Sequence, residues 1–186
     1  MTISKYNVAT ACNKPYSITL AKEFLRGSDV GICPVISFPA GNYTTSIKCA
    51  EADEASRPLV LTSKWKLTWE EIQAVNRIAT YNGAILKVIF KNGYLSAAEI
   101  AQLCHVYTDL KVAFVKTSTG YGFVKQQDGS YNYKGATVEH LKLMRKELGN
   151  NVQIEAAGGV RTLDDLIQVR RLGVKRVGAT TTIRYT

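Results

Sequence analysis

The sequence of 186 residues has no long apolar run and no charged amino-terminal stretch followed by an apolar segment. A membrane-spanning helix needs roughly 18 predominantly apolar residues in succession, so the pattern predicts no spanning segment. A secretory signal needs the charged and apolar regions that residues 1–15 lack. We therefore expect a cytoplasmic protein with no membrane partner.

Motifs for metal and dinucleotide binding are also missing. The cysteines, Cys12, Cys33, Cys49 and Cys104, form no CxxC pair, and the two histidines are far apart in sequence. Zinc ligands usually lie closer together, and no GxGxxG motif follows an early strand-like run. We therefore expect no metal and no cofactor. Because Cys12 and Cys33 lie in apolar runs, we expect them to be buried, reduced thiols.

The charge is one-sided but dispersed. Twenty-four Lys and Arg residues against 15 Asp and Glu residues give a net charge of +9, without a block of five or six like charges. The hydrophobic content of 46% is typical of a globular chain and excludes wholesale disorder. Such a surface can attract phosphates, but we expect no extended nucleic-acid binding. A nucleic-acid binder, recognised by a steep salt dependence of affinity, is the weakest of three hypotheses.

Strand-like and helical patterns alternate along the chain. Thr68 precedes Glu71 by three residues, which is the spacing of a capping box. Ser96 and Glu99 repeat that spacing, and Thr162 precedes two aspartates at another helix start. The predicted strands are 6–12, 30–37, 58–62, 84–90, 111–117, 152–157 and 175–179, and the predicted helices are 16–27, 44–55, 68–81, 96–108, 137–148 and 163–172. This alternation predicts a parallel sheet covered by helices in one domain, residues 1–186; a barrel and an open sheet both satisfy it.

Residues 121–135 interrupt the alternation. The Asp-Gly pair at 128–129 is typical of a two-residue hairpin turn, and Phe123, Tyr131 and Tyr133 flank it. In a barrel, the connection after a strand lies on the catalytic face. The insert is therefore a candidate lid, with a surface hairpin of no consequence as the alternative.

Two lysines stand in apolar strand patterns. Lys87 and Lys116 fall on neighbouring strands of a sequential parallel sheet. Burying a charged amine is costly, and desolvation together with a second cation favours the neutral amine, which is a nucleophile toward carbonyls. The alternative is that one or both lysines reach solvent from strand ends.

Two small-residue loops follow the last strands. Gly158 and Gly159 precede a predicted helix, and Thr180 and Thr181 follow the final strand. Glycine lets backbone N–H groups approach an anion, and hydroxyl groups add donors. Because barrels often bind phosphate at these two loops, the pattern predicts a phosphorylated small-molecule ligand.

At these residues the sequence resembles the deoxyribose-phosphate aldolase family. The matching stretches are KVIFKNGYL, FVKTSTG, GATVEHLKLMR, AAGGVRT and, more loosely, ACNKP and VISFPAGNYTTSIKCAEADEA. The resemblance implies a TIM-type (β/α) barrel that cleaves 2-deoxyribose 5-phosphate to glyceraldehyde 3-phosphate and acetaldehyde through a lysine Schiff base, without metal. Lys116 matches the Schiff-base lysine, and Gly158, Gly159, Thr180 and Thr181 match the phosphate loops.

The chain departs from the family at several positions. Glu155 stands where the family has its second lysine, Leu59 aligns with its relay aspartate, and Lys91 replaces an acidic residue. The resemblance begins at the family's second strand and stops before its closing helix. We therefore expect a barrel of about seven parallel strands that lacks the first β/α unit, and a homodimer is one way to cover the resulting edges.

Two functional hypotheses follow. In the first, Lys91 and Glu155 are an exchanged charge pair flanking Lys116. Lys116 is then the nucleophile of an aldolase-like lyase, Lys87 the neighbouring cation, and Glu155 an acid or base. In the second, Glu155 keeps Lys116 protonated, so the protein is an inactive relative that binds a phosphate ligand or a partner.

Overall fold

The computed structural model describes residues 8–55, 65–120, 124–125, 129, 131–132 and 135–179. Two compact units divide the chain, Met1–Lys87 and Val88–Thr186. No helix in these described ranges is long and apolar enough to cross a membrane.

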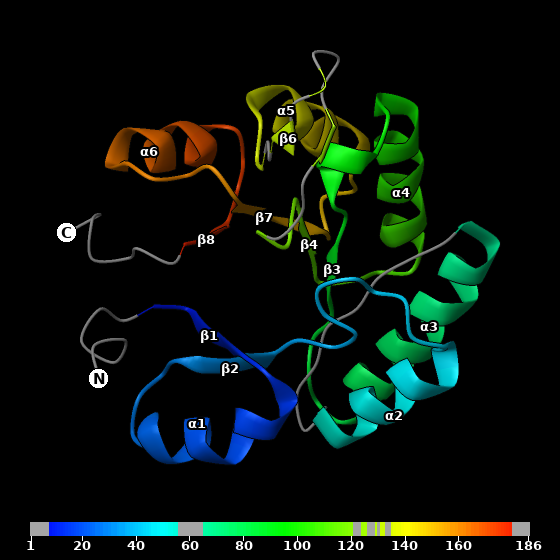
Figure 1. The fold of residues 1–186 in the computed structure, drawn as a ribbon, viewed down its shortest axis with the longest axis vertical. Coiled ribbons are helices and arrows are strands. Elements are labelled where there is room, and N and C mark those ends of the chain that lie inside the picture. The colour runs from blue at the N-terminus through cyan, green and yellow to red at the C-terminus, as the bar shows by residue number, and fades with distance from the viewer. Residues whose placement is uncertain are drawn as a thin grey trace. The chain divides into compact units, whose positions relative to one another are not determined.

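The first unit pairs a small parallel sheet with helices (Figure 1). Its elements are β1 (Thr10–Asn13), the 3-10 turn η2 (Pro15–Ser17), α1 (Ile18–Phe24), β2 (Gly31–Pro34), α2 (Thr45–Ala55) and α3 (Trp65–Tyr81). Strands β1 and β2 are parallel, and α2 packs against α3. Its buried apolar residues include Leu25, Val30, Ile36, Ala52, Ile72, Val75, Ala79 and Leu86.

A buried ion pair joins α2 to α3. The Lys48 ammonium contacts Glu71 Oε1, and the two side chains are only 3% and 1% exposed. The expected helix start at Thr68 is wrong, because α3 already contains residues 65–67 and Thr68 lies inside it. Glu71 is therefore not a capping residue, and its carboxylate forms an ion pair with Lys48 instead.

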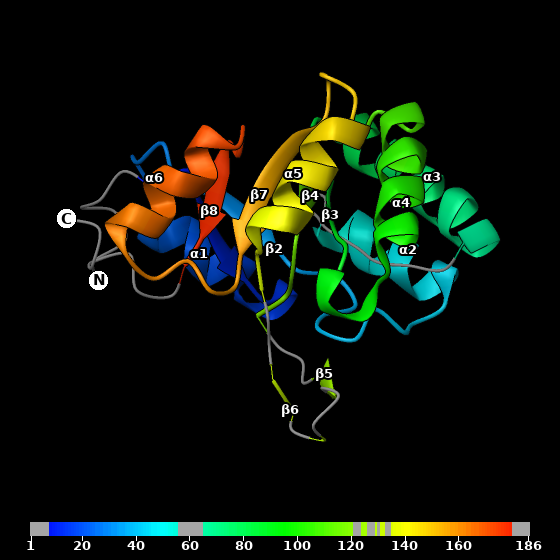
Figure 2. The same ribbon diagram turned by 90° about the horizontal axis from the view of Figure 1, so that it is seen from above.

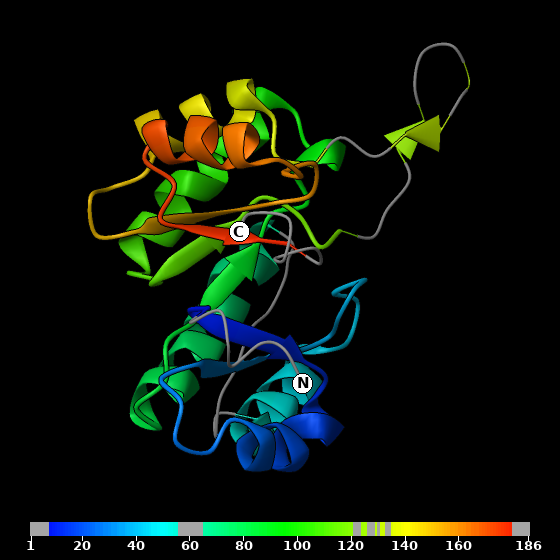
Figure 3. The ribbon, with the colours of Figure 1, turned by 90° about the vertical axis from the view of Figure 1, so that its left-hand side faces the viewer.

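The second unit contains most of a four-stranded sheet of order β3-β4-β7-β8 (Figures 1 and 3). Its elements are β3 (Lys87–Ile89), which starts at the border of the units, η3 (Asn92–Tyr94), α4 (Ala97–Asp109), β4 (Phe114–Lys116), β5 (Val124–Lys125), β6 (Tyr131–Asn132), α5 (Val138–Glu147), β7 (Gln153–Ala157), α6 (Leu163–Arg171) and β8 (Arg176–Gly178). Strands β4, β7 and β8 run parallel. Helices α4 and α5 pack together, and α5 also contacts β7.

The helices of this unit start and pack as the sequence predicts. Ser96 and Thr162 each form a capping box at the start of α4 and α6. The apolar side of α4 is buried, and Tyr107 meets Phe90 edge-on, with ring centroids 5.2 Å apart. Such aromatic pairs add to the stability gained from burial alone.

The insert between β4 and α5 forms a hairpin in its described part. Strands β5 and β6 are antiparallel, with Val124 opposite Asn132 and Lys125 opposite Tyr131. They form a two-stranded sheet of their own, separate in hydrogen bonding from the four-stranded sheet (Figure 2). The predicted hairpin is thereby confirmed, and Gly129 has a positive φ of 81°. The expected two-residue turn at 128–129 is wrong, because that turn would set Lys125 opposite Asn132 rather than Tyr131. Asp128 lies outside the described residues.

Every predicted helix overlaps an observed one, and the described predicted strands are also present. The predicted strand 58–62 lies outside the described residues. The expected burial of two cysteines is wrong, because Cys12 is exposed and Cys33 is half-buried. Apolar neighbours in sequence misled the prediction, since a strand alternates its side chains between two faces.

Candidate functional site

Lys116 and Glu155 form an ion pair at the centre of the parallel sheet. Lys116 ends β4, Glu155 is its partner in register on β7, and Lys116 Nζ lies 3.1 Å from Glu155 Oε1. The side chains are only 13% and 5% exposed. The sheet order thus brings the predicted nucleophile and the predicted acid or base within the reach of direct proton transfer.

The next strand of the sheet, β8, lies beside this ion pair. A Cβ atom on Gly178 would lie 3.2 Å from Glu155 Oε1 and 3.4 Å from Lys116 Nζ, so the backbone of β8 passes directly beside both charged atoms. Arg176 pairs in register with Glu155, and its guanidinium lies 4.4 Å from the centroid of the Phe114 ring. Arg176 is not among the predicted site residues, although Phe114, Glu155 and Arg176 share one parity on adjacent strands, which is the pattern that would identify it.

A threonine ties β4 to β7 immediately beyond the ion pair. Thr117 Oγ1 donates to Ala157 O and accepts from Ala157 N, both at 2.9 Å, and Thr117 N donates to Glu155 O. Thr117 is fully buried. These bonds fix the spacing of the strands that present Lys116 and Glu155, so Thr117 is a positioning residue for the site.

We expect Thr117→Val to weaken both fold and site. Valine has nearly the same shape but removes both bonds of the hydroxyl to Ala157, which costs about 1–3 kcal/mol when the polar groups left behind are buried. Urea unfolding measures this loss. Thr117→Ser keeps the hydroxyl and is the matched control; equal stability of Thr117→Val and wild type would contradict the role of the hydroxyl.

The glycine turn after β7 is held by the segment that follows the hairpin. Gly158 and Gly159 have φ values of 81° and 88°, which glycine adopts without strain. Ala136 N donates to Gly158 O at 2.8 Å, and a Cβ atom on Gly135 would overlap the backbone of Gly158. Gly135 is therefore required to be glycine by close backbone approach rather than by its own φ.

The N-terminus of α6 binds the carboxylate of Asp165, a residue of the same helix. Asp165 Oδ2 accepts from Arg161 N and Thr162 N at 3.0 and 2.9 Å. The hydrogen bonds from Arg161 N and from Thr162 hold the pKa of Asp165 below its usual range. The expected cap at Thr162 is confirmed, and these two N–H groups are occupied by the carboxylate.

Other predicted site residues are placed only in part. Lys87 is 5% exposed in β3 and belongs to the first unit. Lys91 has its ammonium 5.6 Å from the centroid of the Tyr94 ring. The remaining candidates, Thr180, Thr181, Phe123 and Tyr133, lie outside the described residues, as does Leu59; Tyr131 lies in β6 without a described side chain.

Among the described residues, no cluster of three or more His, Cys, Asp or Glu side chains could hold a metal ion. The Lys116–Glu155 pair has instead the chemistry of an amine and a carboxyl group. An amine that loses its proton can attack a carbonyl carbon, and a neighbouring carboxyl group can move the protons that this attack requires.

The fold is that of the aldolases with a TIM-type α/β barrel. A crystal structure of a putative deoxyribose-phosphate aldolase from Coccidioides immitis superposes with a TM-score of 0.83 at 31% identity, covering 97% of this chain and 72% of that one. No protein-family model matches the chain.

Relatives in sequence narrow this class to one family. Deoxyribose-phosphate aldolase from Rhodopirellula baltica is 40% identical over 189 residues, covering 95% of this chain and 74% of that protein. The enzyme of the same name from Treponema denticola is 34% identical over 191 residues, covering 96% of this chain and 84% of that protein. The chain belongs to the deoxyribose-phosphate aldolase family.

Proposed function

We propose that this protein is a class I aldolase that cleaves 2-deoxyribose 5-phosphate through a Schiff base on Lys116. The observation that carries the proposal is the buried Lys116–Glu155 pair at the position of FVKTSTG, the family's lysine motif. The names of the relatives support a catalytic protein rather than the inactive alternative.

The first step converts the ion pair into a nucleophile. One proton moves across 3.1 Å from Lys116 Nζ to Glu155 Oε1, which leaves a neutral amine and a carboxylic acid. Attraction between opposite charges favours the ion pair, whereas burial favours the neutral pair, because desolvated charges are costly. A substrate that covers the exposed part of the Lys116 side chain therefore shifts the balance toward the neutral pair.

The next steps use the same proton. The Nζ lone pair attacks the aldehyde carbon of the open-chain sugar, and one proton of the amine moves to the aldehyde oxygen. Glu155 then gives its proton to the resulting hydroxyl group, which leaves as water and yields the protonated imine. The protonated imine at C1 then draws the electrons of the C2–C3 bond into an enamine, which breaks that bond. The Glu155 carboxylate accepts the proton of the C3 hydroxyl group, and C3 becomes the aldehyde carbon of glyceraldehyde 3-phosphate. Return of that proton to the enamine and hydrolysis release acetaldehyde and restore Lys116.

The phosphate group has its place at the turn of Gly158 and Gly159, together with Thr180 and Thr181. The two glycines, both with positive φ, follow the carboxyl end of β7, next to the strand that bears Lys116, and backbone N–H groups in such turns can bind an anion. Lys87 acts as the second cation, and the insert at 121–135 covers the bound sugar.

Trapping the Schiff base tests the function. Acetaldehyde and borohydride should leave a reduced adduct on Lys116, identified by peptide mass spectrometry, and deoxyribose 5-phosphate should yield an aldehyde in a coupled assay. Absence of both, with a phosphate-dependent rise in melting temperature, would favour the inactive relative instead.

We expect Glu155→Gln to lower cleavage by about 10²–10⁴-fold, the usual range for one acid–base group. The amide keeps the shape of the side chain but cannot accept the proton of Lys116. Turnover rates of the variant and of Glu139→Gln, an exposed change in α5, make the comparison. A variant faster than wild type would mean that the carboxylate inhibits the lysine.

Three structural predictions belong to the same proposal. They are the barrel that lacks one β/α unit, its organisation as one domain over 1–186, and a homodimer that covers exposed strand edges. The parallel sheet and its helices support the first of them.

A further inference from the structure

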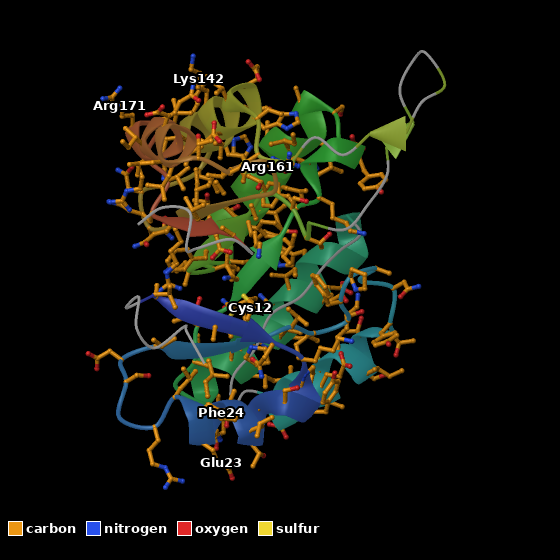
Figure 4. The ribbon with its side chains drawn as sticks, turned by 60° about the vertical axis from the view of Figure 1, so that its left-hand side comes forward. Cys12, Glu23, Phe24, Lys142, Arg161 and Arg171 are labelled. Atoms are coloured by element: carbon orange, nitrogen blue, oxygen red, sulfur yellow. The ribbon has the colours of Figure 1, made fainter. Side chains whose placement is uncertain are left out.

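Two cysteines far apart in sequence lie opposite each other on the two neighbouring strands of the first unit. Cys12 on β1, labelled in Figure 4, is the partner in register of Cys33 on β2, and the two strands are parallel. Neighbouring strands lie about 4.8 Å apart, and partners in register direct their side chains to the same face. A disulfide needs Cα atoms about 4.4–6.8 Å apart, so the backbone already meets this requirement.

The same face leaves room for both sulfur atoms. The preceding pair in register on this face is Thr10 with Gly31, and Gly31 has no side chain. Large side chains are thus absent on that side of the thiols. Cys12 is exposed and Cys33 half-buried, so a reagent from solvent reaches Cys12 first.

The other cysteines provide an internal contrast. Cys104 is buried in α4, and this burial raises the pKa of its thiol to about 12. Burial and the carboxylate of Glu71 also raise the pKa of Cys49 above its ordinary value. Since the thiolate is the reactive form, these two cysteines resist oxidation.

We propose that Cys12 and Cys33 form a cross-strand dithiol site that a disulfide oxidant of the glutathione class converts reversibly into a disulfide. The Cys12 thiolate attacks glutathione disulfide, forming a mixed disulfide and releasing one glutathione. The Cys33 thiolate then attacks the Cys12 sulfur, and the second glutathione leaves. In balance, two thiols lose two protons and two electrons, and one glutathione disulfide becomes two glutathiones. This site does not depend on the aldolase proposal.

The test uses the full chain with glutathione disulfide, followed by alkylation of remaining thiols and peptide mass spectrometry. We expect one cross-linked peptide that joins Cys12 to Cys33, lacking two hydrogen atoms, with Cys49 and Cys104 alkylated. Dithiothreitol should restore both thiols. Separate glutathione adducts on the two cysteines, no reaction, or a cross-link to Cys49 or Cys104 would overturn the proposal.

Single variants and a second probe check the pairing without relying on the cross-link. Cys33→Ser should retain a glutathione adduct on Cys12 because the resolving thiol is gone, whereas Cys49→Ser should behave like wild type. A trivalent arsenical, phenylarsine oxide, bridges two adjacent thiols and should bind wild type but neither Cys12→Ser nor Cys33→Ser. Equal binding by the single variants would show that the two sulfur atoms do not act together.

Discussion

Lys116→Met is expected to reduce cleavage of deoxyribose 5-phosphate by at least about 10⁴-fold, beyond the loss of a single acid–base group. Methionine has a similar length but no amine, so no carbon–nitrogen bond can form. The measurements are the turnover rate and the borohydride adduct, which should both vanish. Lys142→Met, an exposed change in α5, is the matched control (Figure 4).

A second variant separates chemistry from folding. Lys116→Met leaves the Glu155 carboxylate buried without its ammonium, and breaking a buried pair in this way costs about 3–5 kcal/mol. Lys116→Met combined with Glu155→Gln removes both charges and should regain part of that stability while it remains inactive. Substantial cleavage by this folded double variant would assign the nucleophile to another residue.

Glu71→Ala is expected to destabilise the first unit by about 3–5 kcal/mol, because it leaves the Lys48 ammonium buried without its carboxylate. Urea unfolding measures the change. Replacing both residues, with Lys48→Met and Glu71→Leu, should be far less harmful, since apolar side chains of similar volume can fill the same space. Glu70→Ala, one residue earlier in α3 and exposed, is the control.

A small effect of Glu71→Ala would contradict the buried pair as a determinant of stability. If the double variant were less stable than Glu71→Ala, apolar side chains could not replace the ion pair. The charged groups would then be required for α2 to pack on α3.

Local patterns predicted most of the elements. Ser96 and Thr162 cap their helices, and each exchanges hydrogen bonds with the acidic residue three positions later. Thr68 and Glu71 have the same spacing, yet a lysine from α2 takes the carboxylate. A contact between distant segments cannot be inferred from the spacing of residues within one helix.

The candidate site was easier to predict in its residues than in its geometry. Strand parity and the motif FVKTSTG predicted Lys116 as the nucleophile, and the departure from the family drew attention to Glu155. Their contact depends on the order β4-β7 and on the register of these strands. The bond of Thr117 to Ala157 and the approach of Gly135 to Gly158 join segments that no local pattern relates.

The junction of Gly135 with Gly158 has a practical consequence for engineering. Because the return of the hairpin to the domain is anchored there by backbone packing, a grafted peptide between β5 and β6 needs no compensating redesign of the anchor. New binding sequences could therefore be inserted between β5 and β6, provided that Gly135 is retained.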